Sequence, residues 1–175
     1  MGLRPARTCR DLDKVAWTRF SQKVPRRSYV KTRPHSTLTI FKMGEPKKEF
    51  NYRVDLVSEE DVQVRDNALE SARLAINKFL EKKLPLNYWF VIRVYPHNIV
   101  RENKMILGAG ADRLQKGMRK AFGRATDRAA RIKGGQVIFN VFVAEKNVSI
   151  VKEAYKRACV KMPGRYSVRI TKVAS

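Results

Sequence analysis

YWFVIRVY, at residues 88–95, is the stretch that decides the fold. It is apolar on both faces apart from Arg93, so an extended strand here would be buried on both sides and would lie inside a sheet. VIFNVFVA, at residues 137–144, shows the same pattern and is introduced by Gly134 and Gly135. The sequence therefore predicts two interior strands that are far apart along the chain.

Shorter strands are predicted on either side of these two. LTIFKM at 38–43 is strand-like, and FNYRVDLV at 50–57 alternates apolar and polar residues with a period of two. Near the end of the chain Tyr166, Val168 and Ile170 alternate in the same way. We expect three further strands, the last of which could pair with an earlier one.

Two amphipathic helices are also predicted. The first, at about 68–82, follows a polar connection at 59–63, and Asn67 is its expected N-cap with Glu70 three residues on. The second, at about 148–161, has Asn147 as its expected cap. The apolar stripes are Leu69, Ala72, Ile76, Phe79 and Leu80 in the first helix, and Val151, Ala154, Tyr155, Ala158 and Met162 in the second. The outward face of the second helix is a cationic ridge of Lys152, Lys156, Arg157 and Lys161.

This order of elements predicts an α+β fold, a mainly antiparallel sheet with two helices packed on one face. A chain of 175 residues suits one well-filled domain. We assign residues 37–175 to a single α+β RNA-binding domain with a long glycine-rich loop at about 101–133. Residues 1–36 contain three prolines and almost no apolar periodicity, so we expect an extended basic arm there.

The charge of the chain points to a polyanionic partner. Lys and Arg number 38 against 16 acids, which gives a formal net charge of +22. Such a charge opposes a compact fold by self-repulsion unless a nucleic acid or an anionic membrane neutralises it. No apolar run reaches the roughly 20 residues that span a bilayer, so membrane insertion is not expected. Cys9 and Cys159 are the only cysteines, which favours a reducing compartment without disulfides.

The charge is concentrated in three regions. Residues 1–35, 101–133 and 146–175 carry +8, +7 and +7, whereas residues 45–83 carry −1 and should face away from phosphates. The aromatic side chains of the arm could stack on bases or fold back onto the core. For the arm cations we favour RNA contact by Arg4, Arg7, Arg10, Arg19, Lys23, Arg26, Arg27 and Lys31.

RENKMILGAGADRLQKGMRKAFGR, at 101–124, is the most basic glycine-rich stretch. Its seven cations, which include Arg101, face two acids, and Gly108 and Gly110 allow the backbone to approach a ligand closely. Asp112 could cap a short helix in which Leu114, Met118 and Phe122 recur at helical spacing. The alternative is a solvated connector between two core elements. We favour a loop that reaches a nucleic acid.

Catalytic chemistry is not indicated. Neither His35 nor His97 has another ligand-type residue at metal-binding spacing, so we expect no metal site. Gly108 to Gly110 resemble the start of a dinucleotide loop, but Arg113 stands where the third glycine belongs. We therefore expect a binding protein without a cofactor, and not an enzyme.

Several runs resemble one family closely. RPAR at 4–7, RDLDK at 10–14, YPHNIVRENKMILGAGADRLQKGMRKAFG at 95–123 and AARIKGGQVIF at 129–139 are similar to the universal large-subunit ribosomal protein family called L-sixteen in bacteria, in its archaeal and eukaryotic branch, L-ten-e. The resemblance covers essentially the whole chain. It departs from the family pattern at Asp127 and Arg128, where a turn with a glycine and a threonine is usual.

The resemblance implies a hammerhead-type α+β fold and a place on the ribosome. Family members bind large-subunit rRNA between the central protuberance and the lateral stalk base, near the aminoacyl-tRNA path, with a loop directed toward the peptidyl-transferase region. Expected partners are therefore large-subunit rRNA, tRNA, 5S rRNA and neighbouring ribosomal proteins, on ribosomes in the cytoplasm.

The residues that match this pattern form two groups. The tRNA-facing loop would be Glu102, Asn103, Lys104, Met105, Ile106, Leu107, Gly108, Ala109, Gly110, Ala111 and Asp112. The cations that bind RNA backbone would be Arg113, Lys116, Arg119, Lys120, Arg124, Arg128, Arg131 and Lys133, in addition to Arg101. The rival interpretation is a free RNA-binding regulator or RNA chaperone, which would share the charge and the arm.

Overall fold

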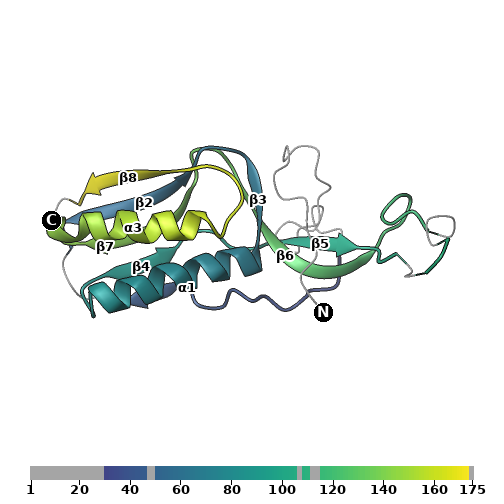
Figure 1. Ribbon diagram of the computed structural model, residues 1–175, viewed down its shortest axis with the longest axis horizontal. Helices are drawn as coiled ribbons and strands as arrows, with labels where there is room; N and C mark the ends of the chain where they lie inside the picture. Colours follow the sequence, from purple (N-terminus) through teal and green to yellow (C-terminus); the bar gives the residue numbers. More distant parts are fainter. Residues whose placement is uncertain (1–29, 47–49, 106–107, 111–114, 174–175) are drawn as a thin grey trace.

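The computed structural model describes residues 30–46, 50–105, 108–110 and 115–173. It is elongated, with the two helices and a five-stranded sheet at one end and a smaller, three-stranded sheet that extends away from them toward a hairpin at the other (Figure 1). Most of the predicted arm, residues 1–29, lies outside the described residues.

The larger sheet is entirely antiparallel. Its strands are β1 (Lys42–Gly44), β4 (Trp89–Ile92), β7 (Val137–Val143), β2 (Tyr52–Ser58) and β8 (Tyr166–Lys172), in that spatial order. The interior positions predicted for β4 and β7 are confirmed, and β7 lies in the middle. Phe90 and Phe139 meet edge to face with ring centres 5.5 Å apart, and both are fully buried. β1 is shorter than the predicted strand at 38–43.

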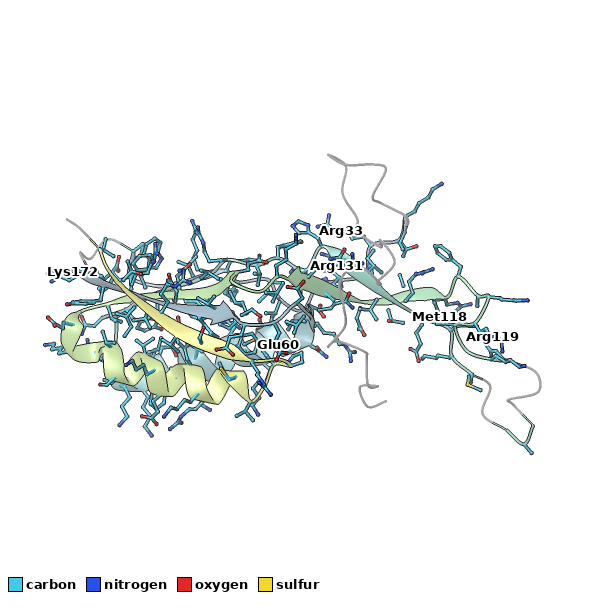
Figure 2. The ribbon with its side chains drawn as sticks, turned by 90° about the horizontal axis from the view of Figure 1, so that it is seen from above. Arg33, Glu60, Met118, Arg119, Arg131 and Lys172 are labelled. Carbon is cyan, nitrogen blue, oxygen red and sulfur yellow. The ribbon has the colours of Figure 1, made fainter. Side chains whose placement is uncertain are left out.

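Both helices cover the same face of this sheet (Figure 2). α1 runs over Asp66–Lys83, and α3 over Val148–Cys159 after a 3-10 turn, η3, at Glu145–Asn147. The two predicted apolar stripes are confirmed, since every residue in them is buried. The Tyr155 hydroxyl donates a 2.8 Å hydrogen bond to the Val54 carbonyl, and burial raises the pKa of this phenol well above its ordinary value. This bond joins α3 to the middle of β2.

Of the two predicted helix caps, Asn67 was wrong, whereas Asn147 occupies the predicted N-cap position but makes no capping side-chain bond. α1 begins two residues before the predicted start at about 68, at Asp66, whose carboxylate accepts hydrogen bonds from the backbone N–H groups of Asn67 and Thr37, both at 2.9 Å. Glu70 does not close a capping box and instead pairs with Arg73. Asn147 stands at the N-cap position of α3 without a capping side-chain bond, because the chain enters through η3, where its N–H donates to the Ala144 carbonyl.

A second antiparallel sheet was not predicted from the sequence. Its strands are β3 (Val62–Arg65), β6 (Arg124–Ile132) and β5 (Asn98–Glu102), in that order. The predicted connection at 59–63 and loop at 101–133 are therefore partly strand, and Asp127 and Arg128 lie in β6 and not in a turn. Alanines and charged residues in β6 conceal the strand pattern. Asp127 can lie in this strand because it pairs with Arg65, and Arg128 because it bonds Pro34 and Tyr95.

Candidate nucleic-acid interface

The hairpin of β5 and β6 carries most of the predicted interface. Glu102 pairs with Arg124 at its far end, and residues 103–123, here called the hairpin tip, connect the strands. The predicted helix through Leu114, Met118 and Phe122 was wrong for the described part of the tip. There the chain forms turns, in which the Arg119 N–H donates to the Lys116 carbonyl and the Ala121 N–H to the Met118 carbonyl.

The base of the hairpin tip is closed by side chains. Arg101 Nη1 donates a 2.6 Å hydrogen bond to the Phe122 carbonyl, and its guanidinium carbon lies 4.5 Å from the centre of the Phe122 ring. Asn103 Nδ2 donates a 2.9 Å bond to the Gly117 carbonyl. Gly123 has a φ of 77°, and a Cβ there would lie 2.7 Å from the Met118 sulfur and 3.1 Å from the Glu102 carbonyl oxygen. Position 123 therefore requires glycine.

The Arg101–Phe122 and Asn103–Gly117 contacts form what we call the closed frame of the hairpin. Exposed cations lie beside it. Lys104, Lys116, Arg119, Lys120 and Arg124 are all exposed. Arg119 and Met118 lie far from the helices in Figure 2, on the part of the molecule that extends furthest from the core. Lys120 has a positive φ of 57°, which places it at a turn between Arg119 and the clamped Phe122. The frame presents four of the predicted RNA-binding side chains together: Lys116, Arg119, Lys120 and Arg124.

The glycine-rich end of the tip has room around its backbone. Gly108 and Gly110 are exposed, and a Cβ at either would meet no atom within 4 Å. Met105 is 42% exposed. Of the predicted tRNA-facing loop, Ile106, Leu107, Ala111 and Asp112 lie outside the described residues, as does Arg113.

Arg128 is placed in the interior. It is 7% exposed, and its Nε donates a 2.7 Å hydrogen bond to the Pro34 carbonyl while Nη1 donates a 3.1 Å bond to the Tyr95 hydroxyl. Arg33 Nη2 donates to the same hydroxyl at 3.2 Å. Burial raises the pKa of the Tyr95 phenol, but the bonds and charges of the two guanidiniums outweigh burial and lower this pKa below its ordinary value. This joint ties residues 33 and 34 to β6.

The remaining predicted cations differ in exposure. Lys31 and Lys133 are exposed. Arg131 is half-buried opposite Gln63 of β3, and burial lowers the pKa of its guanidinium. Arg4, Arg7, Arg10, Arg19, Lys23, Arg26 and Arg27 lie outside the described residues.

Asp127, an acid inside the basic region, forms an ion pair within the protein. Its carboxylate lies 2.7 Å from Arg65 Nη2 on the neighbouring strand β3. The two residues are diagonal neighbours, because Arg65 pairs directly with Ala129. The negative charge of Asp127 is thus balanced within the protein and does not oppose phosphate binding at the hairpin.

Sequence reasoning did not identify Tyr95, Arg33 and Pro34 as parts of one joint. The available signal was a tyrosine at the end of an apolar strand, which gives no indication of a partner 62 residues earlier. In the part of the chain that the structure describes, no group of His, Cys, Asp and Glu could hold a metal ion. No described helix is both long enough and apolar enough to cross a membrane.

The fold and the interface define an α+β protein whose basic hairpin extends from a two-helix core, an arrangement suited to binding a polyanion. Residues 19–169 match the family described as Ribosomal protein L16p/L10e. The Large ribosomal subunit protein uL16 of Methanococcus maripaludis (strain DSM 14266) is 42% identical over 173 residues, which cover 98% of this chain and 96% of that protein.

Relatives from other archaea agree. The uL16 protein of Archaeoglobus fulgidus is 43% identical over 84% of this chain and 85% of its own length, and that of Staphylothermus marinus is 44% identical over 93% and 90%. The chain belongs to the L16p/L10e family of ribosomal proteins. The resemblance drawn from its motifs is thereby confirmed, and the protein is a structural one and not an enzyme.

Proposed function

We propose that this protein binds large-subunit rRNA near the aminoacyl-tRNA path and the peptidyl-transferase region, and that its hairpin tip approaches tRNA during translation. The observation that carries the proposal is the cluster of exposed cations Lys116, Arg119, Lys120 and Arg124 beside the closed base of the hairpin tip. Of these, Arg119 is seen far from the helices (Figure 2). Clustered, exposed cations bind phosphates by releasing counterions, and they need no catalytic group to do so.

The exposure and bonding of the predicted cations support different roles for them. Exposed Lys31, Lys116, Arg119, Lys120, Arg124 and Lys133 are the described side chains that we assign to RNA backbone. The Arg128 guanidinium donates hydrogen bonds to Pro34 and Tyr95, so we assign Arg128 to the joint and not to the interface. Arg101 holds Phe122 and supports the interface indirectly. The arm cations Arg4 to Arg27 and Arg113 remain predictions from the sequence.

The glycine-rich end of the tip is the part that we assign to tRNA. Open space around Gly108 and Gly110 lets backbone amides approach a ligand without an intervening Cβ. The exposed Met105 adds an apolar contact that is costly to leave in water without a partner. These features support a contact outside the domain, since this part of the tip adds no residue to the helix stripes.

Family membership favours this function over a free RNA-binding regulator or chaperone. It also supports the expected location on cytoplasmic ribosomes and the expected neighbours, 5S rRNA and other ribosomal proteins. The direct test is sedimentation of the tagged protein, expressed in cells, through a high-salt sucrose cushion. We expect it to remain with large subunits in a fixed ratio to their rRNA.

A control for this experiment is a basic protein of similar charge that binds ribosomes only electrostatically, because high salt should remove it. If the tagged protein leaves the subunits in the same wash as this control, it is not an integral component. The regulator or chaperone interpretation would then replace the one proposed.

A further inference from the structure

β8 is an edge strand of the larger sheet. β8 pairs with β2 along all seven of its residues, in a register that runs without a shift from Lys172 opposite Tyr52 to Tyr166 opposite Ser58. No other described strand lies on its second side. The opposite edge strand, β1, has only three residues, and short edges are a common protection against pairing. β8 is long, contains no proline, and is exposed from Ser167 to Lys172.

The apolar face of the sheet continues past the helices onto β8. Val168 and Ile170 pair with Leu56 and Val54, and those two β2 side chains are fully buried. Val168 and Ile170 themselves are 38% and 41% exposed. Figure 2 shows β8 crossing in front of the sheet between Glu60 and Lys172, at the margin of the helix layer. The apolar side chains of β8 are therefore only partly covered by the described residues, and a further strand beside β8 could cover them.

The charges along β8 indicate which kind of partner this edge could bind. Arg169 and Lys172 are exposed along this strand, and Arg165 at its start is exposed but lies 3.5 Å from the Glu60 carboxylate. Arg169 lies on the face opposite to Val168 and Ile170. A second copy of this chain would bring two molecules of charge +22 together at this edge, which charge repulsion opposes. The cations attract an acidic segment instead.

The backbone of the edge distinguishes a peptide from RNA. Every second residue of an edge strand directs its N–H and C=O outward, in alternating donors and acceptors that another extended chain matches. A phosphate backbone supplies acceptors only, and it offers nothing to cover Val168 and Ile170. The features of β8 taken together thus favour a strand over a nucleic acid.

We propose that β8 accepts an extended acidic segment of a partner protein as a sixth strand of the larger sheet. The segment would alternate apolar side chains, which lie beside Val168 and Ile170, with acidic side chains on the face of Arg169. This site is separate from the hairpin and does not depend on the function proposed for it.

The test uses the full-length protein and a synthetic peptide that alternates glutamate with valine and isoleucine. Hydrogen exchange followed by mass spectrometry reads protection of the β8 amides, and fluorescence anisotropy of the labelled peptide gives the Kd. We expect binding below about 1 mM at low salt, with slowed exchange in residues 166–172. A peptide of the same composition in scrambled order should bind more weakly and should not protect β8.

Two variants separate strand addition from general attraction. Arg169→Gln should weaken peptide binding about three- to fivefold, whereas Lys152→Gln, the same charge change on α3, should leave the Kd nearly unchanged. Val168→Thr keeps the β-branched shape but adds a polar group to the apolar face, and it should also weaken binding. Val160→Thr is its control, because Val160 is 82% exposed at the end of α3. Circular dichroism confirms that each variant is folded.

Several outcomes would overturn the proposal. Peptide binding without protection of β8 would mean attraction to another basic surface. Equal binding of the scrambled peptide would exclude strand pairing. Protection of β8 in the free protein at rising concentration, with a dimer in sedimentation equilibrium, would identify a second copy as the occupant. Protection by a uridine oligonucleotide but not by the peptide would assign this edge to RNA.

Discussion

Arg101 holds Phe122 by two contacts, a 2.6 Å hydrogen bond to its carbonyl oxygen and a stacking of the guanidinium 4.5 Å from the centre of its ring. Arg101 lies in β5, and Phe122 lies two residues before β6 begins. A planar side chain with several donors can make both contacts at once, which an ammonium group cannot. The direction of the hairpin tip is therefore fixed from its base.

We predict that Arg101→Lys loosens the tip without unfolding the protein. The lost cation–π contact and hydrogen bond are worth about 1 to 2 kcal/mol, and the contacts are far from the core. Hydrogen exchange should quicken in residues 115–123, while the melting temperature falls by no more than about 3 °C. Arg124→Lys, on the adjacent strand end, should change neither. An unaltered exchange rate in Arg101→Lys would show that the clamp does not hold the tip.

The exposed cations of the tip should set the salt dependence of RNA binding. Replacing Arg119, Lys120 and Arg124 together by alanine should make the plot of log K against log salt shallower by about 2 to 3, since each phosphate contact contributes roughly 0.7 to 0.9. The matched control is alanine at Lys152 and Lys156 on α3 and at Lys161 just after it, which removes the same charge. If the two triple variants have the same slope, the tip has no special share in RNA binding.

Deleting Met105 to Ala111 should leave the fold intact and impair translation. The described residues of this segment make no contribution to the buried core, and both helices and β4 and β7 remain complete. The melting temperature of the free variant should stay within about 2 °C of the parent. Ribosomes that contain it should accommodate tRNA or form peptide bonds more slowly. A length-matched serine segment controls for shortening. A large loss of stability with normal translation would assign the segment to the core.

The joint at Tyr95 should make stability depend on alkaline pH. Because Arg33 and Arg128 lower the pKa of Tyr95 in the folded state, their contribution is fully present above the ordinary value of 10.0 and is lost as the pH falls through the lowered pKa. Tyr95→Phe should therefore cost more stability at about pH 10.5 than at about pH 8, measured by urea unfolding.

Tyr155 supplies a control of opposite sign. Burial raises its pKa, so its contribution is fully present below the ordinary pKa and declines as the pH rises above it. The cost of Tyr155→Phe should shrink over the pH range in which the cost of Tyr95→Phe grows. If both costs change in the same direction, the guanidiniums do not stabilise the Tyr95 phenolate.

Strong local patterns in the sequence were sufficient for much of the core. The interior strands β4 and β7 follow from largely apolar runs, interrupted only by Arg93 and Asn140, and both helix stripes follow from a regular helical repeat. β3, β5 and β6 were missed because their burial depends on one another. In β6 the charged Asp127 and Arg128 read as loop residues, and only the neighbouring Arg65 and Tyr95 show why they can lie in a strand.

The sequence was sufficient to predict where exposed cations cluster, but not which cations are bonded within the protein. Clustered cations identified the hairpin region, and exposure confirmed that Arg119, Lys120 and Arg124 are available. Arg128 looked the same in the sequence, since nothing local distinguishes a guanidinium bonded inside the protein from one in water. The Asn67 cap was wrong for a similar reason: α1 begins at Asp66, whose carboxylate accepts a hydrogen bond from the distant Thr37 N–H.

The hydrogen bond from Arg128 to the Pro34 carbonyl also sets the earliest time at which this joint can form during protein synthesis. It joins residues 94 positions apart, and a ribosome adds about 5 to 20 residues each second. Roughly 5 to 20 s must therefore pass between the synthesis of Pro34 and the appearance of its partner. During this interval residues 33 and 34 cannot be held at this joint, whatever else has folded. Thr37, three residues after Pro34, can bond Asp66 after only 29 further residues, so neighbouring parts of one segment gain their attachments at very different times.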